Sequence, residues 1–81
     1  MVASIDQHLG TRVTLAREQR RLTLSEVAAQ LDISIERLVD FEHGAVRIPA
    51  LFVARLSRVL DVTPRWLYNG LPGQDTFDRT G

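Results

Sequence analysis

Helix-capping signals recur at short intervals along this sequence. Ser4-x-x-Gln7 and Thr23-x-x-Glu26 both have the form of a capping box, whose two side chains bind free backbone N–H groups at the start of a helix. Thr63-Pro64 combines a capping residue with a proline in the first helical turn, where the missing N–H costs nothing. Because no stretch alternates apolar and polar residues over the length of a strand, the sequence predicts an all-α domain of short helices.

We expect five helices. The first runs over about residues 5–21, the second from the Thr23 cap to about Gln30, the third over 35–43 after Ser34, the fourth from Pro49 to about Leu60, and the fifth contains Trp66, Leu67 and Tyr68. Gly44 should end the third helix, and Gly70 lies just past the fifth. Apolar residues at helical spacing should face the core: Ile5, Leu9, Val13, Ala16, Val27, Ala28, Leu31, Leu38, Phe41, Val53, Leu56, Val59 and Leu60. Residues 1–70 therefore form the predicted domain, and residues 71–81 are predicted to be a flexible tail.

The size and composition of the chain exclude several classes of function. Its 81 residues suffice for one small domain and leave no room for a deep active-site cleft. The absence of cysteine excludes disulfides, cysteine zinc sites and thiol nucleophiles, and it suits a reducing cytoplasm. No apolar run approaches about 18 residues and the N-terminus lacks the pattern of an export signal, so we expect a cytoplasmic protein without a membrane segment.

Arrangements typical of metal sites and active sites are also missing. His8 and His43 each lack a zinc-type ligand three or four residues further along the chain. Glu36 and Asp40 stand one helical turn apart, but no nucleophile or oxyanion-hole motif accompanies them. We therefore expect neither an enzyme nor a protein that holds a metal or another cofactor.

The charges are segregated along the chain although their sum is zero. Residues 12–21 and 47–65 each carry four arginines against one acid, whereas residues 26–42 carry five acids against one arginine. All ten basic residues are arginine. Arginine is the residue best suited to phosphates and guanine edges, but a base-composition bias of the gene gives the same pattern, so both interpretations stay open.

The second and third expected helices, joined by the turn Leu31-Asp32-Ile33-Ser34, have the spacing of a helix-turn-helix. Further motifs accompany this turn: Leu9-Gly10-x-Arg12-Val13, Arg17, Leu22-Thr23-x-x-Glu26-Val27-Ala28, Phe41-Glu42-x-Gly44, Arg47-Ile48-Pro49, Leu60-Asp61-Val62 and Trp66-Leu67-x-x-Gly70. In these motifs, over about residues 5–70, the sequence resembles the Cro/C1-type (phage-repressor-like, XRE) family. The resemblance implies a compact five-helix, lambda-repressor-like DNA-binding domain. It also implies a structural ion pair between Arg17 and Glu42, and a close-packing role for Gly10.

The resemblance further implies which positions meet DNA. The family places the start of the third helix in the major groove, a polar residue of the second helix on a phosphate, and the following loop on the backbone. The implied DNA-binding residues are Thr23, Leu24, Ser34, Ile35, Glu36, Arg37, Val39, Asp40 and Arg47, with Ala45 and Val46 in the same loop. Many of these positions are apolar or acidic here, which leaves Arg37 and Arg47 as the positive contacts. Glu36 or Asp40 is suited to accept from cytosine N4, and Val39 to touch a thymine methyl group.

Two hypotheses about function follow. The first is a DNA-binding transcription regulator of bacterial or phage origin, nucleoid-associated when bound, whose homodimer places its third helices in successive major grooves of double-stranded DNA. The second is a degenerate helix-turn-helix that binds a protein partner through its acidic face and has little affinity for DNA. Leu51, Phe52, Trp66 and Tyr68 are candidates for the surface of a dimer or another partner, since at least one of Leu51 and Phe52 should face outward. The alternatives are that Phe52 folds over the loop at residues 44–48, and that Trp66 and Tyr68 pack in the core and at its edge.

Overall fold

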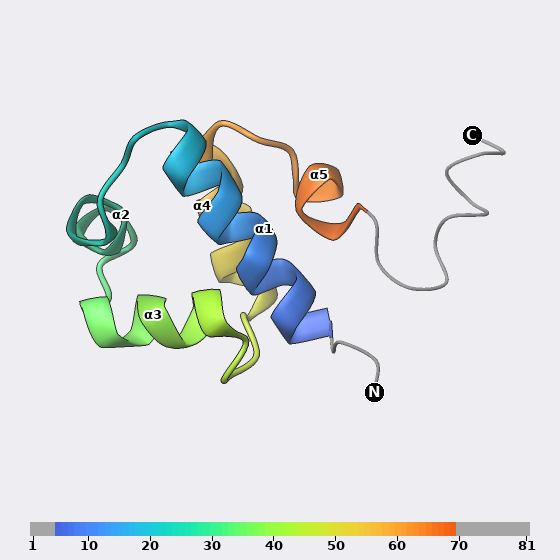
Figure 1. The fold of residues 1–81 in the computed structure, drawn as a ribbon, viewed down its shortest axis with the longest axis horizontal. Helices are drawn as coiled ribbons and strands as arrows, with labels where there is room; N and C mark the ends of the chain where they lie inside the picture. Colours follow the sequence, from blue (N-terminus) through green and yellow to red (C-terminus); the bar gives the residue numbers. More distant parts are fainter. Residues whose placement is uncertain (1–4, 70–81) are drawn as a thin grey trace, which may run out of the picture.

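The computed structural model describes residues 5–69, and within that range the chain forms five helices and no strand (Figure 1). The helices are α1 (Ile5–Gln19), α2 (Leu24–Leu31), α3 (Ile35–His43), α4 (Ala50–Leu60) and α5 (Pro64–Tyr68). The predicted all-α fold of five helices is confirmed. The predictions for the Ser4 capping box, for Gly70 and for the tail over residues 71–81 lie outside the described residues.

Three helices start at the capping residues found in the sequence. The Thr23 hydroxyl accepts from the Glu26 N–H at 3.0 Å, and the Glu26 carboxylate accepts from the Thr23 N–H at 2.8 Å, which completes the predicted capping box. Ser34 and Thr63 cap α3 and α5 through their hydroxyls. These bonds satisfy N–H groups that a helix start leaves free, so α2, α3 and α5 begin where predicted.

Four helices are followed by a left-handed residue, and only one of these residues is glycine. They are Arg21, Asp32, Gly44 and Asp61, with φ between 56° and 72°. After α1, the N–H groups of Arg21 and Leu22 donate to the carbonyls of Glu18 and Arg17, both at 3.0 Å, which is the bond pair of a Schellman motif. Equivalent pairs close α2, α3 and α4. This turn ends α1 at Gln19 rather than at the predicted residue 21. The prediction missed the turn because no glycine marks it in the sequence.

The start of α4 also differs from the prediction. The sequence places Pro49 in the first helical turn, whereas its extended backbone, with ψ of 149°, makes it the N-cap. Its carbonyl accepts from the N–H groups of Phe52 at 2.8 Å and Val53 at 3.0 Å. Because proline has neither an N–H nor a polar side chain, α4 begins at Ala50 without a side-chain cap.

The hydrophobic core draws on every helix and on Ile48 in the loop between α3 and α4. The buried apolar residues are Leu9, Val13, Ala16, Val27, Ala28, Leu31, Leu38, Phe41, Ile48, Val53, Leu56, Leu60 and Leu67. Two core predictions are wrong. Ile5 is 55% exposed, because it is the first residue of α1 and precedes the buried part of that helix, which begins at Leu9. Val59 is only partly buried, and Ser57 takes the fourth place on the buried face of α4, where its hydroxyl donates to the Ala54 carbonyl at 2.7 Å.

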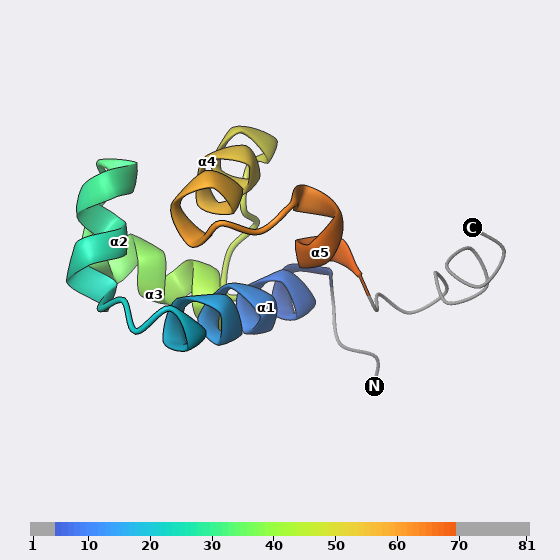
Figure 2. The same ribbon diagram turned by 90° about the horizontal axis from the view of Figure 1, so that it is seen from above.

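The long helix α1 organises the arrangement. It contacts α3, α4 and α5, while α2 contacts α3 and α4. In Figures 1 and 2, α2 and α3 lie at one end of the molecule and α5 lies at the other. None of the helices within residues 5–69 is long and apolar enough to cross a membrane.

Candidate nucleic-acid interface

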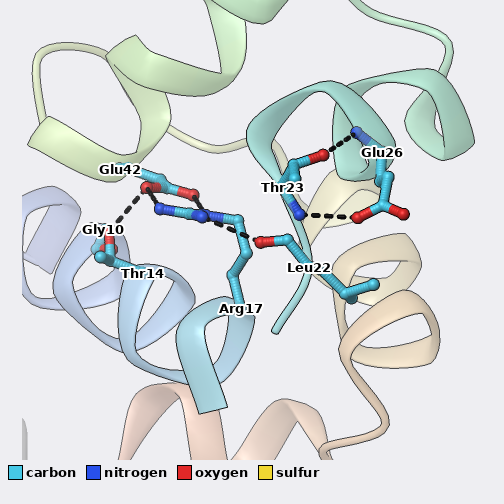
Figure 3. A network of polar contacts seen from close by, with 7 residues as sticks. All are labelled: Gly10, Thr14, Arg17, Leu22, Thr23, Glu26 and Glu42. Atoms are coloured by element: carbon cyan, nitrogen blue, oxygen red, sulfur yellow. Dashed lines mark hydrogen bonds and ion pairs between the residues drawn. The ribbon is translucent and has the colours of Figure 1, made fainter. Parts of the chain in front are cut away.

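A polar network joins the C-terminal end of α3 to α1 (Figure 3). The Glu42 carboxylate accepts from Arg17 Nε at 2.7 Å and from Arg17 Nη2 at 3.2 Å, and the Thr14 hydroxyl lies 2.9 Å from its Oε1. Arg17 Nη1 also donates to the Leu22 carbonyl at 3.0 Å, just before the cap of α2. The expected contact between Arg17 and Glu42 is therefore present, and it connects α1 with the segment that leads into α2 as well as with α3.

This ion pair is shielded from water. Only 14% of the Arg17 side chain and 6% of the Glu42 side chain are exposed, so solvent screens their attraction weakly. The hydrogen bond to Glu42 raises the pKa of the Arg17 guanidinium above its ordinary value, against the lowering effect of burial. Arg17 therefore stays charged, and the pair acts as a fixed contact between α1 and α3.

Gly10 allows α1 and α3 to approach each other closely beside this pair. A Cβ atom at this position would overlap with the backbone carbonyls of Phe41 and Glu42. Since neither carbonyl belongs to a flexible side chain, only glycine fits without a shift of one helix. The predicted close-packing role of Gly10 is confirmed, and together with the ion pair it sets the direction in which the outer face of α3 points.

The turn between α2 and α3 brings these two helices together as a helix-turn-helix. Asp32 adopts the left-handed conformation with φ of 59°, and the next N–H, that of Ile33, donates to the Ala28 carbonyl at 3.0 Å. Ser34 then caps α3 through a 3.0 Å bond from the Arg37 N–H to its hydroxyl. Each of the three turn residues thus has a structural role, and α3 leaves the turn with one side against the core.

The outer face of α3 is acidic. Glu36, Asp40 and His43 are exposed at a spacing of four and three residues, opposite the buried Leu38 and Phe41. Ile35, at the start of the helix, is 45% exposed. His43 was not among the predicted DNA-binding residues, although its spacing from Asp40 places it on the same face. No group of three or more potential metal ligands gathers within residues 5–69.

Four of the predicted DNA-binding residues are engaged within the protein. Leu24 is partly buried and packs against the core, and Val39 is partly buried. The hydroxyls of Thr23 and Ser34 accept backbone N–H bonds as helix caps. Among the predicted residues of α3, Ile35, Glu36, Arg37 and Asp40 are exposed.

The two predicted positive contacts lie at the edges of this face. The Arg37 guanidinium carbon is 5.3 Å from the centre of the Phe41 ring and 5.7 Å from that of Phe52, so the side chain lies along the flank of α3 next to α4. Arg55, three residues after Phe52 on α4, reaches the same Phe52 ring at 5.7 Å, a contact that helical spacing could have indicated but that the sequence analysis missed. Arg47 is exposed in the loop between α3 and α4.

The candidate partner surface contains one strongly exposed apolar residue. Leu51 is 58% exposed, which confirms that at least one member of the pair Leu51 and Phe52 faces outward. Phe52 packs against the core with its ring centre 5.8 Å from that of Phe41, so the two do not form an exposed pair. The reason is helical geometry, since Phe52 stands on the side of α4 that faces α3.

Trp66 and Tyr68 are half-buried against the core as well. Arg12 lies over the Trp66 ring at 3.8 Å from its centre and donates to the Trp66 carbonyl from Nε at 3.1 Å and Nη2 at 2.8 Å. His8 Nε2 lies 2.7 Å from the Asn69 carbonyl. These bonds attach α5 to α1, so one face of Trp66 is already covered by the chain itself.

Comparisons with known proteins agree with this geometry. A sequence model of the helix-turn-helix domain family matches residues 10–71. Two curated relatives are described as uncharacterized HTH-type transcriptional regulators, one from Sinorhizobium medicae and one from Rhizobium meliloti. Each is 26% identical over 69 residues, which cover 85% of this chain and 50% of the relative. The chain therefore spans about half the length of the curated relatives it matches.

Solved structures show the same fold. The restriction-modification controller protein C.AhdI from Aeromonas hydrophila has a TM-score of 0.72 at 21% identity, covering 76% of this chain and 94% of that one. The Clp gene regulator ClgR from C. glutamicum has a TM-score of 0.77 at 20% identity, covering 80% and 84%. SinR, the master regulator for biofilm formation, was solved in complex with DNA; its TM-score is 0.66 at 28% identity, covering 73% and 95%.

Proposed function

We propose, because this chain belongs to the helix-turn-helix domain family and to its Cro/C1 type, that it is a DNA-binding transcription regulator whose α3 enters the major groove. The observation that carries this proposal is the outer face of α3. On that face Glu36, Asp40 and His43 are all exposed, while the opposite side of α3 is fixed to α1 by Gly10 and the Arg17–Glu42 pair. The curated relatives are described as transcriptional regulators, and the SinR structure contains DNA.

The chemistry of the face favours particular base pairs. Carboxylates accept hydrogen bonds and donate none, so Glu36 and Asp40 suit the N4 amino group of cytosine in the major groove. The exposed Ile35 adds an apolar contact of the kind that thymine methyl groups accept. We therefore expect a recognition sequence in which cytosine stands opposite the middle of α3.

Affinity must come from other groups, because two carboxylates near the phosphates oppose binding. Arg47 in the loop after α3 and the N-terminus of α2, with its positive dipole end, are the backbone contacts on the two sides of the helix-turn-helix. A homodimer doubles this set and fits a near-palindromic site with half-sites about 34–36 Å apart. In this proposal the protein acts on the bacterial chromosome, in a binding rather than a catalytic role.

Selection from a pool of randomised duplexes tests the proposal. The wild-type chain should enrich a sequence containing cytosine at a defined position, and the isosteric variants Glu36→Gln and Asp40→Asn should change the base enriched there. Glu18→Gln, an exposed position on α1, is the matched control and should keep the wild-type sequence. Failure of the wild type to enrich any sequence, or to bind labelled duplex at about 50 mM salt, would contradict a DNA-binding role.

A further inference from the structure

Two arginines from different helices meet at one aromatic ring beside α3. The guanidinium carbons of Arg37 and Arg55 each lie 5.7 Å from the centre of the Phe52 ring, and Arg37 is also 5.3 Å from that of Phe41. Both arginines are exposed, while Phe52 is partly buried and packs on Phe41. We call Arg37, Phe52 and Arg55 the Phe52 cluster.

The two guanidinium groups of the Phe52 cluster have no internal counter-charge. Neither forms an ion pair or a side-chain hydrogen bond with any of residues 5–69. Arg12, Arg17 and Arg20 differ in this respect, since Arg12 binds the Trp66 carbonyl, Arg17 binds Glu42 and Arg20 pairs with Asp61. The cluster therefore places two positive charges at one ring, each 5.7 Å from its centre, and contact with the ring restricts their side chains while leaving their donors free.

The position of the cluster relates it to the acidic face of α3. Arg37 follows Glu36 directly and precedes Asp40 by three residues, but its contacts with Phe41 and Phe52 direct it to the flank next to α4. An arginine held there is turned away from the centre of the groove that α3 enters. The phosphates that border the groove are the anions nearest to such a flank.

We propose that Arg37 and Arg55 bind phosphates of the DNA backbone as a pair positioned by Phe52, so that Arg37 supplies affinity for any sequence and does not select a base. This inference rests on the proposed function and names two of its backbone contacts. It also explains how a helix with carboxylates on its outer face approaches a polyanion. From the flank of α3, the positive charges of the cluster offset the repulsion between these carboxylates and the phosphates, and the base edges are left to Glu36 and Asp40.

The salt dependence of binding distinguishes a phosphate contact from a base contact. The full chain is titrated onto a labelled duplex of mixed sequence, long enough for two half-sites, at about 50 and about 200 mM salt. Each lost phosphate contact should lower the slope of log affinity against log salt by about 0.9. Over this fourfold change in salt, Arg37→Ala and Arg55→Ala should each reduce the ratio of the two affinities by about 3–4-fold per protein subunit bound.

Further variants separate the roles within the cluster. Arg65→Ala, at the start of α5, is the matched control and should keep the wild-type slope. Arg37→Lys should retain most of the slope because it keeps the charge, and Phe52→Tyr should retain it because it keeps the ring. Phe52→Leu should lower the slope although both arginines are present, provided that circular dichroism shows it folded. If Phe52→Leu is folded and keeps the full slope, the positioning role of the ring is wrong.

The selection experiment with Arg37→Ala gives the decisive result. If the variant enriches the same sequence as the wild type and binds more weakly with a lower slope, the inference holds. If it enriches a different sequence, or if its slope equals that of the wild type, Arg37 contacts a base or contacts nothing, and the inference is overturned while the proposed function survives. Absence of binding by the wild-type chain overturns the proposed function and this inference with it.

Discussion

Removal of the Glu42 carboxylate should be among the most damaging single changes to this domain that do not touch the apolar core. The carboxylate receives two hydrogen bonds from Arg17, at 2.7 and 3.2 Å, and lies 2.9 Å from the Thr14 hydroxyl. In Glu42→Ala the Arg17 guanidinium, whose side chain is 14% exposed, keeps its charge but loses its partner. An uncompensated charge in such a place costs about 3–5 kcal/mol.

This cost is large compared with the expected stability of the molecule. A chain of 81 residues is stable by roughly 4–12 kcal/mol, so the variant should lose about a quarter or more of its free energy of unfolding. Glu42→Gln keeps the size of the side chain and one acceptor oxygen. It should therefore cost less than Glu42→Ala, about 1.5–3 kcal/mol, which is the usual value of a hydrogen bond to a charged group.

Urea unfolding measures these differences. Trp66 is the single tryptophan and is half-buried on α5, so its fluorescence reports on the tertiary structure, and circular dichroism reports on the helices. The double variant Arg17→Met, Glu42→Leu removes both charges and replaces them with apolar groups of similar length. We expect it to be more stable than Glu42→Ala, because no charge stays buried alone, although the Leu22 carbonyl loses its bond from Arg17.

The refuting result is a double-mutant cycle without coupling. If Arg17→Met, Glu42→Ala and their combination have additive effects within about 0.5 kcal/mol, the two side chains act independently. The argument that their contact fixes α3 on α1 is then wrong. A coupling of about 1–3 kcal/mol supports it.

Three further predictions concern the same part of the molecule. Gly10→Ala should lower the free energy of unfolding by about 1–3 kcal/mol, as measured by urea unfolding, because the new methyl group meets two backbone carbonyls of α3; an unchanged midpoint would show that the helices separate at no cost. Thr23→Ala should cost about 1 kcal/mol by the same measurement, because the Glu26 N–H loses its acceptor, and a neutral result would mean that the cap is replaced by water. The coupling between Arg17 and Glu42 should be the same at about pH 7 and pH 10: a raised pKa gives stability that is fully present below the ordinary arginine value and is lost only above it. A coupling that falls within this interval would contradict the assigned charge state.

The helix starts and the helix-turn-helix were predictable from the sequence because their causes are local. Thr23, Ser34 and Thr63 each cap a helix through atoms within three residues, and Gly44 ends α3 in the left-handed conformation. The helix ends were less predictable, since Arg21, Asp32 and Asp61 adopt the same conformation without being glycine. Each of these turns is closed by a pair of backbone hydrogen bonds, which residue propensity alone does not reveal.

The candidate interface divides in the same way. Sequence spacing alone placed Glu36 and Asp40 on one exposed face, because neighbours on a helix are set by its period. The direction of Arg37 was decided only by the tertiary structure, which brings Phe52 from the next helix beside it, whereas Arg55 reaches the same ring from three residues further along α4. A contact between side chains on different helices depends on how those helices cross, and the crossing depends on distant pairs such as Gly10 with Glu42. For this protein, local chemistry determined which segments are helical and which residues share a helix face, and long-range packing determined which ring Arg37 of α3 meets on α4.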